Sequence, residues 1–464
     1  SPAYFFNEKV MCALGAGLSE TNRLSPEGRS RALAALRRFA ILAEAMDATP
    51  ISVVATAAMR DAEDGPEFCA EIERETGLKP WVIDGTEEAR LSAQGVLLGW
   101  PGAEGIVCDI GGSSMELAEL KGGMVGLRGT SPLGPLKLRE VSGGKKGLDR
   151  YIAQEIGRLV APMPIAPPRL YLVGGSWRAI ARLDMERRGY PLTVLHEYRM
   201  TRAALLETID WIAGSDPDAL RQKTGTSPDR MALVPYAAQV LRKLVAHLRP
   251  HEIAVSSYGI REGLLYEQMP ADLRARDPLI EACRFAEQRA ARQPGFGNRL
   301  YNFILPLFGA AGPDKRRLIR AACLLHDTAW RAHPDYRHEI CFDSATQANL
   351  GGLEHWERVF LGVSLLHRYK NSRSGSRFEP LFSLLDADRM RQAEVLGKAM
   401  RFGAMFSLHA PDSLAELRHY PKKKQLELIL AEAAVPLFGE VAAARFASLA
   451  KALGVETSVR VRRR

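Results

Sequence analysis

The stretch Gly105-Ile-Val-Cys-Asp-Ile-Gly-Gly-Ser-Ser-Met-Glu-Leu-Ala-Glu-Leu120 decides the fold of this chain. Its first half is an apolar run, which predicts a buried strand that ends in the carboxylate of Asp109. From Met115 onward apolar and acidic side chains alternate, which predicts a second strand rather than a helix. The glycines between the strands lack Cβ atoms, so successive backbone N–H groups can turn toward one point and hold an anion. The segment therefore predicts a strand–loop–strand hairpin that binds phosphate.

The predicted loop consists of Gly111, Gly112, Ser113 and Ser114, and the strand after it carries Glu116. Walker and Rossmann loops lead into a helix N-terminus and have other glycine spacings, so the hairpin is of neither kind. Acidic groups beside a phosphate loop suit a hard cation such as Mg²⁺, which prefers carboxylate oxygens and keeps several waters. Taken alone, the segment fits an ordinary glycine-bearing turn equally well.

The surrounding chain alternates strand and helix patterns over its first two-thirds, which predicts an α/β architecture with sheets flanked by helices. Two further Gly/Ser segments follow predicted strands, Val173-Gly-Gly-Ser176 and Ser256-Ser-Tyr-Gly259. Three such loops at strand ends, together with Asp109, predict a phosphate-binding cleft between domains.

From about residue 273 the strand-like runs stop, and residues 314–326 and 424–434 carry helical patterns. We place a domain boundary near Met269-Pro270. An all-α domain is expected at residues 273–434, and a helical, basic tail at residues 435–464. The net charge of +9 favours an anionic partner, although a solvated basic surface explains it as well.

The composition excludes several classes of protein. The sequence contains no run of about 18 apolar residues, the length needed to span a membrane. The first eight residues lack the basic and apolar regions of a secretory signal. Six scattered cysteines without a C-x-x-C pair indicate reduced, mostly buried thiols. We therefore expect a cytoplasmic protein.

Seven segments, in order along residues 7–265, carry a family resemblance. They are Asn7-Glu-Lys-Val-Met-Cys-Ala-Leu-Gly15, Ala55-Thr-Ala-Ala-Met-Arg60, Gly85-Thr-Glu-Glu-Ala-Arg-Leu91, residues 109–116, Leu133-Gly134, Val173-Gly-Gly-Ser176 and Tyr258-Gly-Ile-Arg-Glu-Gly263. Together they resemble the exopolyphosphatase/guanosine pentaphosphate phosphohydrolase (Ppx/GppA) family of the sugar kinase–Hsp70–actin superfamily. The resemblance implies two actin-like, RNase H-like domains at residues 1–95 and 96–270, before the all-α domain.

The resemblance also implies roles for individual residues. Glu88 would be the catalytic carboxylate and Arg60 would grip a phosphate oxygen. Asp109 and Glu116 would hold Mg²⁺, with Mn²⁺ or a monovalent K⁺ as alternatives, and the loop glycines and serines would cradle phosphate. Residue types alone would make Arg60 and Glu88 a surface ion pair or a helix cap. A homodimer is implied as well, with no nucleic-acid or membrane partner.

Two features depart from the family pattern. That pattern begins with a strand and a loop close to Asp-x-Gly-Ser-Asn-Ser, which we expect immediately before Ser1. Without it we expect little hydrolysis. The usual third glycine of the second loop is Ser113 here, and its Cβ restricts φ and could narrow the loop.

The segment Leu324-Leu-His-Asp327 resembles the His-Asp core of HD phosphohydrolases. Residues 281–308 contain no histidine to complete a metal site, and the downstream histidines lack an obvious ligand spacing. They are His333, His338, His355 and His367. We therefore prefer an HD-like domain without a catalytic metal, used for structure or as a substrate channel. A hydrogen-bonded core pair is the simplest alternative.

The resulting hypothesis is an exopolyphosphatase that removes terminal phosphates from inorganic polyphosphate and also accepts guanosine pentaphosphate. The reaction would be in-line attack of a water positioned by a carboxylate, with a divalent cation. The alternatives are a non-enzymatic sensor of polyphosphate or nucleotide, an enzyme chiefly for guanosine pentaphosphate, and, less favoured, a sugar or acetate kinase.

Overall fold

The computed structural model describes residues 6–48, 50–309 and 311–462, and the chain divides into two compact units. The N-terminal unit is Pro2–Arg274 and the C-terminal unit begins at Ala275. Residues 1–5, part of the segment that lacks a secretory signal pattern, lie outside the described residues. So do the last two arginines of the predicted tail. Throughout the three described ranges, no helix combines the length and hydropathy needed to cross a membrane.

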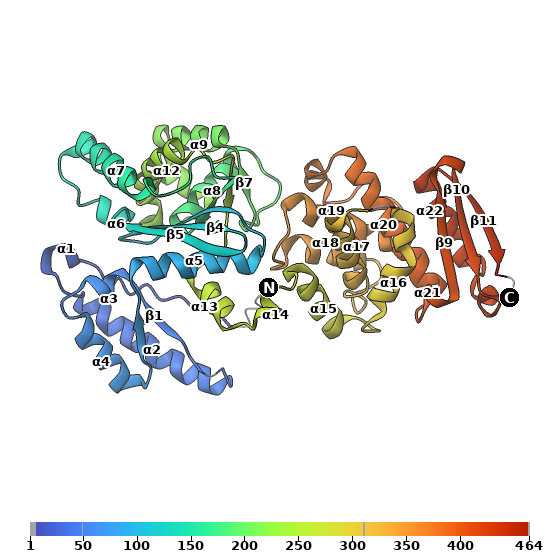
Figure 1. Ribbon diagram of the computed structural model, residues 1–464, viewed down its shortest axis with the longest axis horizontal. Coiled ribbons are helices and arrows are strands. Elements are labelled where there is room, and N and C mark those ends of the chain that lie inside the picture. The colour runs from blue at the N-terminus through green and yellow to red at the C-terminus, as the bar shows by residue number, and fades with distance from the viewer. Residues whose placement is uncertain (1–5, 49, 310, 463–464) are drawn as a thin grey trace. The chain divides into compact units, whose positions relative to one another are not determined.

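A six-stranded sheet in the order β5-β4-β3-β6-β8-β7 forms the centre of the N-terminal unit (Figure 1). Strand β3 pairs with β4 antiparallel and with β6 parallel, and β6 pairs with β8 parallel. The predicted hairpin is confirmed, because Asp109 and Glu116 face each other across β3 and β4. The strands are β3 (Gly105–Ile110), β4 (Met115–Lys121), β5 (Met124–Ser131), β6 (Arg169–Val173), β7 (Arg199–Met200) and β8 (Glu252–Val255).

Helices cover both faces of this sheet. Along β3, Ile106 and Cys108 point into a core formed with α7, α8, α9 and α12, whereas Val107 points toward α5. This alternation follows from the two-residue period of a strand, and it places Asp109 on the side of α5. The helices are α5 (Gly85–Gly99), α7 (Gly144–Val160), α8 (Gly175–Arg187), α9 (Arg202–Gly214), α12 (Val234–Leu248) and α13 (Ile260–Gln268). Shorter ones are α6 (Pro135–Leu138), α10 (Pro217–Thr224), α11 (Pro228–Met231) and α14 (Ala271–Arg274).

Helices α5 and α13 cross at glycines. A Cβ on Gly263 would collide with the carbonyl of Leu91, and one on Gly95 with the backbone of Gly259. The glycines let the two backbones approach closely, and this fixes α5 over the sheet. The predicted division between residues 95 and 96 falls within α5, and the two-domain subdivision stays a prediction.

A smaller part of the N-terminal unit precedes α5. Strands β1 (Val53–Ala55) and β2 (Pro80–Val82) pair in parallel. Helix α2 (Pro26–Ala45) is capped by Ser25, whose hydroxyl accepts from the Gly28 N–H at 3.1 Å. Leu33 of α2 and Phe68 share a small core. The other helices are α1 (Leu18–Thr21), α3 (Ala57–Asp61) and α4 (Gly65–Thr76).

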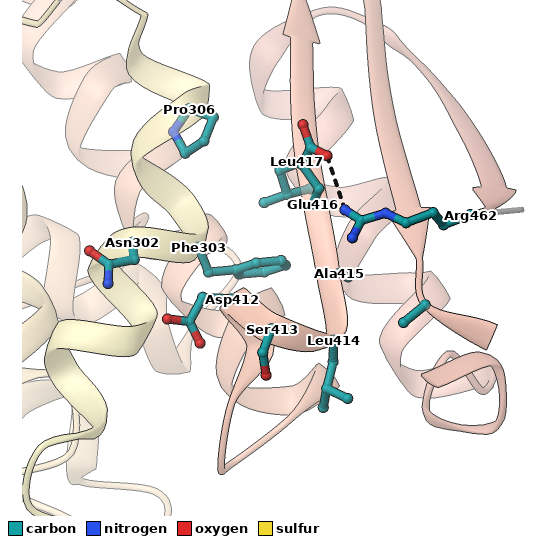
Figure 2. Close-up of a pocket in the computed structure, with 11 residues that line it drawn as sticks. Asn302, Phe303, Pro306, Asp412, Ser413, Leu414, Ala415, Glu416, Leu417 and Arg462 are labelled. Atoms are coloured by element: carbon teal, nitrogen blue, oxygen red, sulfur yellow. Dashed lines mark hydrogen bonds and ion pairs between the residues drawn. The ribbon is translucent and has the colours of Figure 1, made fainter. Parts of the chain in front are cut away.

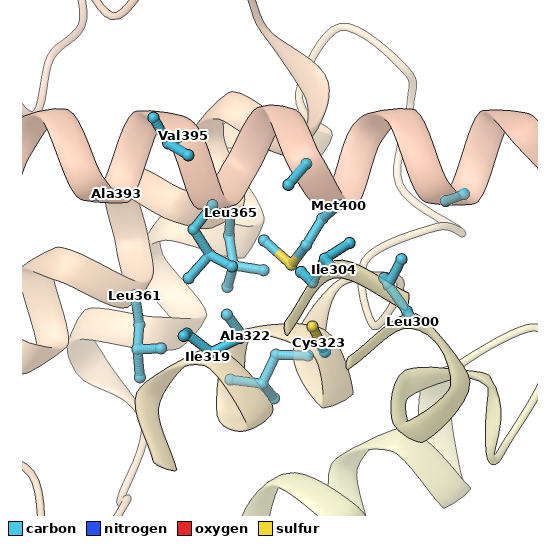
Figure 3. Close-up of a cluster of buried hydrophobic side chains, with 14 of the residues drawn as sticks. Leu300, Ile304, Ile319, Ala322, Cys323, Leu361, Leu365, Ala393, Val395 and Met400 are labelled. Atoms are coloured by element: carbon cyan, nitrogen blue, oxygen red, sulfur yellow. The ribbon is translucent and has the colours of Figure 1, made fainter. Parts of the chain in front are cut away.

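The C-terminal unit is mainly helical, as predicted. Figure 3 shows the centre of its core, where Ile319, Leu361 and Met400 from three helices meet. The main helices are α15 (Pro278–Ala290), α16 (Phe296–Ile304), α17 (Pro313–Leu325), α18 (Arg337–Gln347), α19 (His355–Tyr369), α20 (Ala387–Phe406) and α22 (Glu440–Leu453). Short elements are η1 (Leu305–Phe308), η2 (Glu379–Leu384), α21 (Pro411–Leu414), η3 (Pro421–Lys423) and η4 (Glu432–Leu437).

The C-terminal unit also holds a three-stranded sheet, β11-β10-β9, which the sequence did not predict. Its strands are β9 (Ala415–Tyr420), β10 (Gln425–Leu430) and β11 (Glu456–Val461). The predicted helix over residues 424–434 is wrong, because Leu426, Leu428 and Leu430 alternate into the core of a strand. The predicted tail is helical only in α22 and then forms β11. The lysines at residues 422–424 form the β9–β10 turn, where Lys424 has φ 45°.

A pocket of about 260 Å³ separates α16 and η1 from β9 within this unit (Figure 2). Phe303 lies at its apolar wall, and Glu416 pairs with Arg462 at 3.3 Å on the strand side. The two charges of this pair compensate each other, so the pocket presents no excess charge there.

Candidate active site

Asp109 and Glu116 are buried side by side at the mouth of the β3–β4 hairpin, with 9% and 1% of their surface exposed. Asp109 accepts a short hydrogen bond from the hydroxyl of Ser92 on α5. Glu116 Oε1 accepts from Thr130 Oγ1 of β5 at 3.0 Å. The two carboxylates therefore face α5, each held by one hydroxyl.

The first turn of α5 brings Glu88 to the same place. Asp84 caps the helix by accepting from the Glu87 N–H at 2.8 Å. A Cβ on Gly85 would lie 2.5 Å from Thr130 Oγ1, so only glycine lets the helix start this close to β5. Because Thr130 also holds Glu116, this contact positions Glu88 beside Glu116.

Of the two neighbouring acids Glu87 and Glu88, only Glu88 enters the site. Glu87 accepts two hydrogen bonds from Arg90, at 2.6 and 2.8 Å. Glu88 is 5% exposed, and its Oε2 has no hydrogen-bond partner. Arg90 thus occupies Glu87 and leaves Glu88 as the available carboxylate.

The three carboxylates disfavour one another's charge. Burial, reinforced by Asp109, raises the pKa of Glu88 to about 7. Burial and the neighbouring Glu88 raise the pKa of Glu116 to about 9, and burial raises the pKa of Asp109. Glu116 Oε2, like Glu88 Oε2, lacks a hydrogen-bond partner. Buried carboxylate oxygens that accept no hydrogen bond fit a cation.

Two of these acids could hold a cation. Over the described ranges, no three His, Cys, Asp or Glu side chains converge into a ready-made metal site. Mg²⁺ commonly binds through one or two carboxylates and completes its shell with water and substrate phosphates. Asp109 and Glu116 offer carboxylates of this kind.

Arg60 lies beside Glu88, with Nη1 3.7 Å from Glu88 Oε2. The same Nη1 donates to the carbonyl of Ile83 at 2.9 Å, and Nε donates to Asp61 at 3.2 Å. The side chain is about a quarter exposed, whereas Glu88 is buried. Arg60 is thus anchored at the opening of the site, where its charge can reach an incoming anion.

The Gly/Ser loop is held in place by a hydrogen bond within its own turn and by contacts with residues 134–136. The Gly111 N–H donates to the Ser114 carbonyl at 3.0 Å, so this donor is not free for an anion. The carbonyl of Gly112 accepts from Leu136, and a Cβ on Gly134 would collide with Ser113. The N–H groups of Gly112 and Ser113 have no acceptor in the part of the chain that the structure describes. Both donors are available for phosphate.

The second predicted Gly/Ser segment, Val173-Gly-Gly-Ser176 at the end of β6, also reaches the site. Gly174 has φ +114°, and a Cβ there would lie 3.2 Å from Asp109 Oδ1. The first turn of α8 therefore packs against the carboxylate. Its next turn carries Arg178, whose Nε donates to the Gly174 carbonyl at 3.1 Å.

A basic pocket of about 530 Å³ opens next to Arg178, and sequence reasoning missed it. Lys9, Arg178, Arg182 and Arg230 line it, and none of the four pairs with a carboxylate within the three described ranges. Burial, together with Arg230, lowers the pKa of Lys9 and Arg178, while Asp109 acts against the lowering at Arg178. The spacing of Arg178 and Arg182, one helical turn apart after Gly174, was the only local signal.

Comparisons with known proteins identify the family of the chain. The model of the Ppx/GppA phosphatase family matches residues 2–272, and that of the exopolyphosphatase C-terminal domain matches residues 280–459. Among curated proteins, Retrograde regulation protein 2 of Saccharomyces cerevisiae is 26% identical over 379 residues. The match covers 72% of this chain and 62% of the yeast protein, so the chain spans less than two-thirds of that relative.

Two solved structures show how far the likeness extends. An exopolyphosphatase from Cytophaga hutchinsonii is 20% identical, with a TM-score of 0.51 over 56% of this chain and 88% of its own. The Ppx/GppA family member of Aquifex aeolicus is 21% identical, with a TM-score of 0.49 over 57% and 88%. The first of these supports a common fold for the region that it covers.

Proposed function

Because this chain belongs to the Ppx/GppA phosphatase family, we propose that it hydrolyses terminal phosphates of inorganic polyphosphate and also accepts guanosine pentaphosphate. One observation carries the proposal. Glu88 is buried beside Asp109 and Glu116, and its Oε2 accepts no hydrogen bond and lies 3.7 Å from Arg60 Nη1. A carboxylate held in this way can orient a water molecule.

The chemistry needs little more than this arrangement. Hydrolysis of a phosphoanhydride requires an in-line water and stabilised charge on the phosphate oxygens, and the shortened phosphate chain leaves readily. A pKa of about 7 lets Glu88 accept the proton of that water near neutral pH. Arg60 would hold an oxygen of the terminal phosphate, and the Gly112 and Ser113 N–H groups would hold others. A divalent cation on Asp109 and Glu116, Mg²⁺ or Mn²⁺, would supply further neutralising charge.

The basic pocket supports a substrate with several phosphates. Helix α8 relates the pocket to Asp109, because Gly174 before the helix lies against the Asp109 carboxylate and Arg178 on its next turn lines the pocket. A single phosphate would need only the site at Asp109. Four unpaired cations beyond it favour a polyanion, and such binding should weaken as salt is added.

A second candidate is a regulator that binds polyphosphate or nucleotide without hydrolysing it. The similarity to a yeast protein named for retrograde regulation favours it. Ser113, where the family pattern has glycine, would narrow the phosphate loop, and this also favours binding without hydrolysis. The free Glu88 carboxylate favours the enzyme.

We also assign the protein to a reducing compartment such as the cytoplasm. All six cysteines are free, and burial raises the pKa of the Cys108 and Cys323 thiols. Thiols of this kind are inert and need no oxidant for stability.

Two measurements on the same protein separate the candidates. On protein that carries the Asp-x-Gly-Ser-Asn-Ser loop expected before Ser1, phosphate release is followed with Mg²⁺ on long-chain polyphosphate and on guanosine pentaphosphate. Binding of both is measured by calorimetry with the metal chelated. We expect binding and release with polyphosphate. Binding without release from either compound would identify the regulator, and absence of both would refute the proposal.

A further inference from the structure

The carboxylate of the His326–Asp327 pair, at the end of α17, is already occupied. Arg292 Nε donates to Asp327 Oδ2 at 2.8 Å and Nη2 donates to Oδ1 at 2.6 Å. His326 Nδ1 lies 2.8 Å from the carbonyl of Cys323 and donates to it, and burial lowers the pKa of this ring to about 4. A guanidinium thus stands where the HD resemblance would place a metal ion.

Arg368, near the end of α19, is buried without a hydrogen-bond or ion-pair partner in the described ranges. It is 6% exposed, and its Nε is enclosed without a hydrogen-bond acceptor. No hydrogen bond or ion pair joins its guanidinium to any other residue of the described ranges. Arg358 of the same helix offers a contrast, because its guanidinium donates to the carbonyls of Ala348 and Leu350, both at 2.8 Å. Arg358 is a structural arginine, and Arg368 lacks such a role.

The last turn of α19 ties Arg368 to the His326–Asp327 pair. The guanidinium carbon of Arg368 lies 4.9 Å from the ring centre of Tyr369. The Tyr369 hydroxyl donates to the carbonyl of His326 at 3.0 Å. Arg368 therefore belongs to the end of the helical bundle where Arg292 has already neutralised Asp327.

Helix α20 brings a second arginine to this end. A Cβ on Gly397 would lie 3.1 Å from the Arg368 backbone nitrogen, so α20 touches α19 at this point. Arg401 stands one turn further along α20, on the same face. Its Nη1 donates to Asn371 Oδ1 at 2.8 Å, three residues after Arg368.

Helix α22 contributes the third arginine, Arg445. The rings of Phe402 and Phe446 lie 5.1 Å apart, which brings the preceding residues, Arg401 and Arg445, onto adjoining turns. Arg445 Nε is also enclosed without an acceptor. Burial, with Arg445 and Arg368 adding to it, lowers the pKa of Arg401 to about 10.

Acidic groups near this cluster are already used. Asp327 is held by Arg292, and Glu394 pairs with Lys398 at 2.7 Å and with Arg373 at 3.3 Å. The cluster therefore carries positive charge that no described carboxylate balances. Burying unpaired charge disfavours folding, so its presence calls for a ligand.

We propose that Arg368, Arg401 and Arg445 form a binding site for a phosphate group, referred to below as the arginine site. The planar fork of a guanidinium matches the oxygens of phosphate in bidentate pairs. A carboxylate offers two oxygens and one charge, whereas a phosphate ester offers three oxygens and a charge of about −2. Three forks from three helices suit the phosphate. The inference concerns the C-terminal unit and does not rest on the proposed hydrolysis.

Equilibrium dialysis of the whole protein against inorganic tripolyphosphate, with metal chelated, tests the proposal. We expect two bound equivalents, one in the basic pocket and one in the arginine site. Arg368→Gln and Arg401→Gln should each weaken one equivalent at least tenfold. Arg178→Gln combined with Arg230→Gln should remove the other and leave the arginine site filled. Arg391→Gln is the matched control, because Arg391 is exposed on α20 and pairs with Asp388 at 2.5 Å.

Competition with inorganic phosphate and with a nucleoside triphosphate identifies the source of the phosphate group. Displacement by phosphate alone indicates a free anion, and displacement only by the nucleotide indicates a larger ligand. The proposal is overturned if neither compound competes, or if Arg368→Gln and Arg401→Gln bind two equivalents as the unaltered protein does.

Thermal unfolding of the ligand-free variants gives an independent readout. Arg368→Gln should unfold at the same or a higher temperature than the unaltered protein, because it removes an unpaired buried charge. A folded variant with a lower unfolding temperature would assign Arg368 a structural role and contradict the proposal. If Arg368→Gln does not fold, Arg401→Gln decides alone: loss of one equivalent supports the site, and retention of both rejects it.

Discussion

Replacing Glu116 by glutamine should stabilise the metal-free protein at neutral pH, although the residue is fully enclosed. The pKa of its carboxyl is raised to about 9, first by burial and then by Glu88. Between the ordinary value of 4.5 and about 9, the folded protein binds a proton that the unfolded chain has released. The stability contribution is therefore complete below pH 4.5 and is lost as the pH rises toward 9. Glutamine removes this titration and keeps an oxygen for the Thr130 hydroxyl.

The size of the effect follows from these two values. One pKa unit corresponds to about 1.4 kcal/mol, so holding Glu116 protonated at pH 7 costs the fold about 3 kcal/mol. Glu88 shares the repulsion, and part of the gain will be lost when the carboxyl is replaced. We therefore expect Glu116→Gln to add roughly 1–3 kcal/mol to the free energy of unfolding at pH 7 and little at pH 5.

Urea unfolding in the presence of a chelator measures this difference. Tryptophan fluorescence follows the transition, because Trp177 is fully buried in the N-terminal unit and contributes to the signal. Glu119→Gln, on the same strand, is the matched control and should show no such gain. A Glu116→Gln variant that is less stable at pH 7, or that gains equally at pH 5 and pH 7, would refute the electrostatic account of the site.

Three further changes test other parts of the account. Gly85→Ala should lower the free energy of unfolding in urea by about 1–3 kcal/mol, because the new Cβ would lie 2.5 Å from Thr130 Oγ1. The control Gly157→Ala, where the new Cβ meets open space, should raise the free energy of unfolding by about 0.5–1 kcal/mol. Arg60→Lys keeps the charge but loses the fork, so kcat/KM for polyphosphate should fall at least about tenfold, and unchanged kinetics would remove Arg60 from the site. From pH 6.5 to 4 His326 should cost the C-terminal unit about 3 kcal/mol of stability, since its pKa falls to about 4 on folding and the unfolded chain alone takes up the proton. The pKa of His367 is also lowered to about 4 and adds to this slope, so His326→Gln should reduce the slope in calorimetric scans. An equal slope in both proteins would contradict the assignment.

The parts of the fold that could be predicted are those whose signal is local. The hairpin at residues 105–120 was readable because strand alternation and the glycine loop lie within one short segment. The strand at Gln425–Leu430 was not, because Leu426 through Leu430 also suit a helix. Pairing with β9 and with the distant β11 overrides that preference.

The candidate site shows the same division. Residue types alone gave Arg60 and Glu88 no special role, and only the family resemblance singled them out. Their meeting depends on Gly85 against Thr130, a contact between segments far apart in the sequence. The basic pocket was missed for the same reason, because Lys9, Arg178 and Arg230 come from three separate segments.

The role of Glu88 is the central claim, and its most direct test is the rate of phosphate release from long-chain polyphosphate with Mg²⁺. Glu88→Gln keeps the size of the side chain but cannot accept a proton, so kcat should fall by about 10²–10⁴-fold with little change in KM. Glu87→Gln, next to it but bound to Arg90, should keep most of the activity. A Glu88→Gln protein that releases phosphate within a few-fold of the unaltered rate would contradict the account.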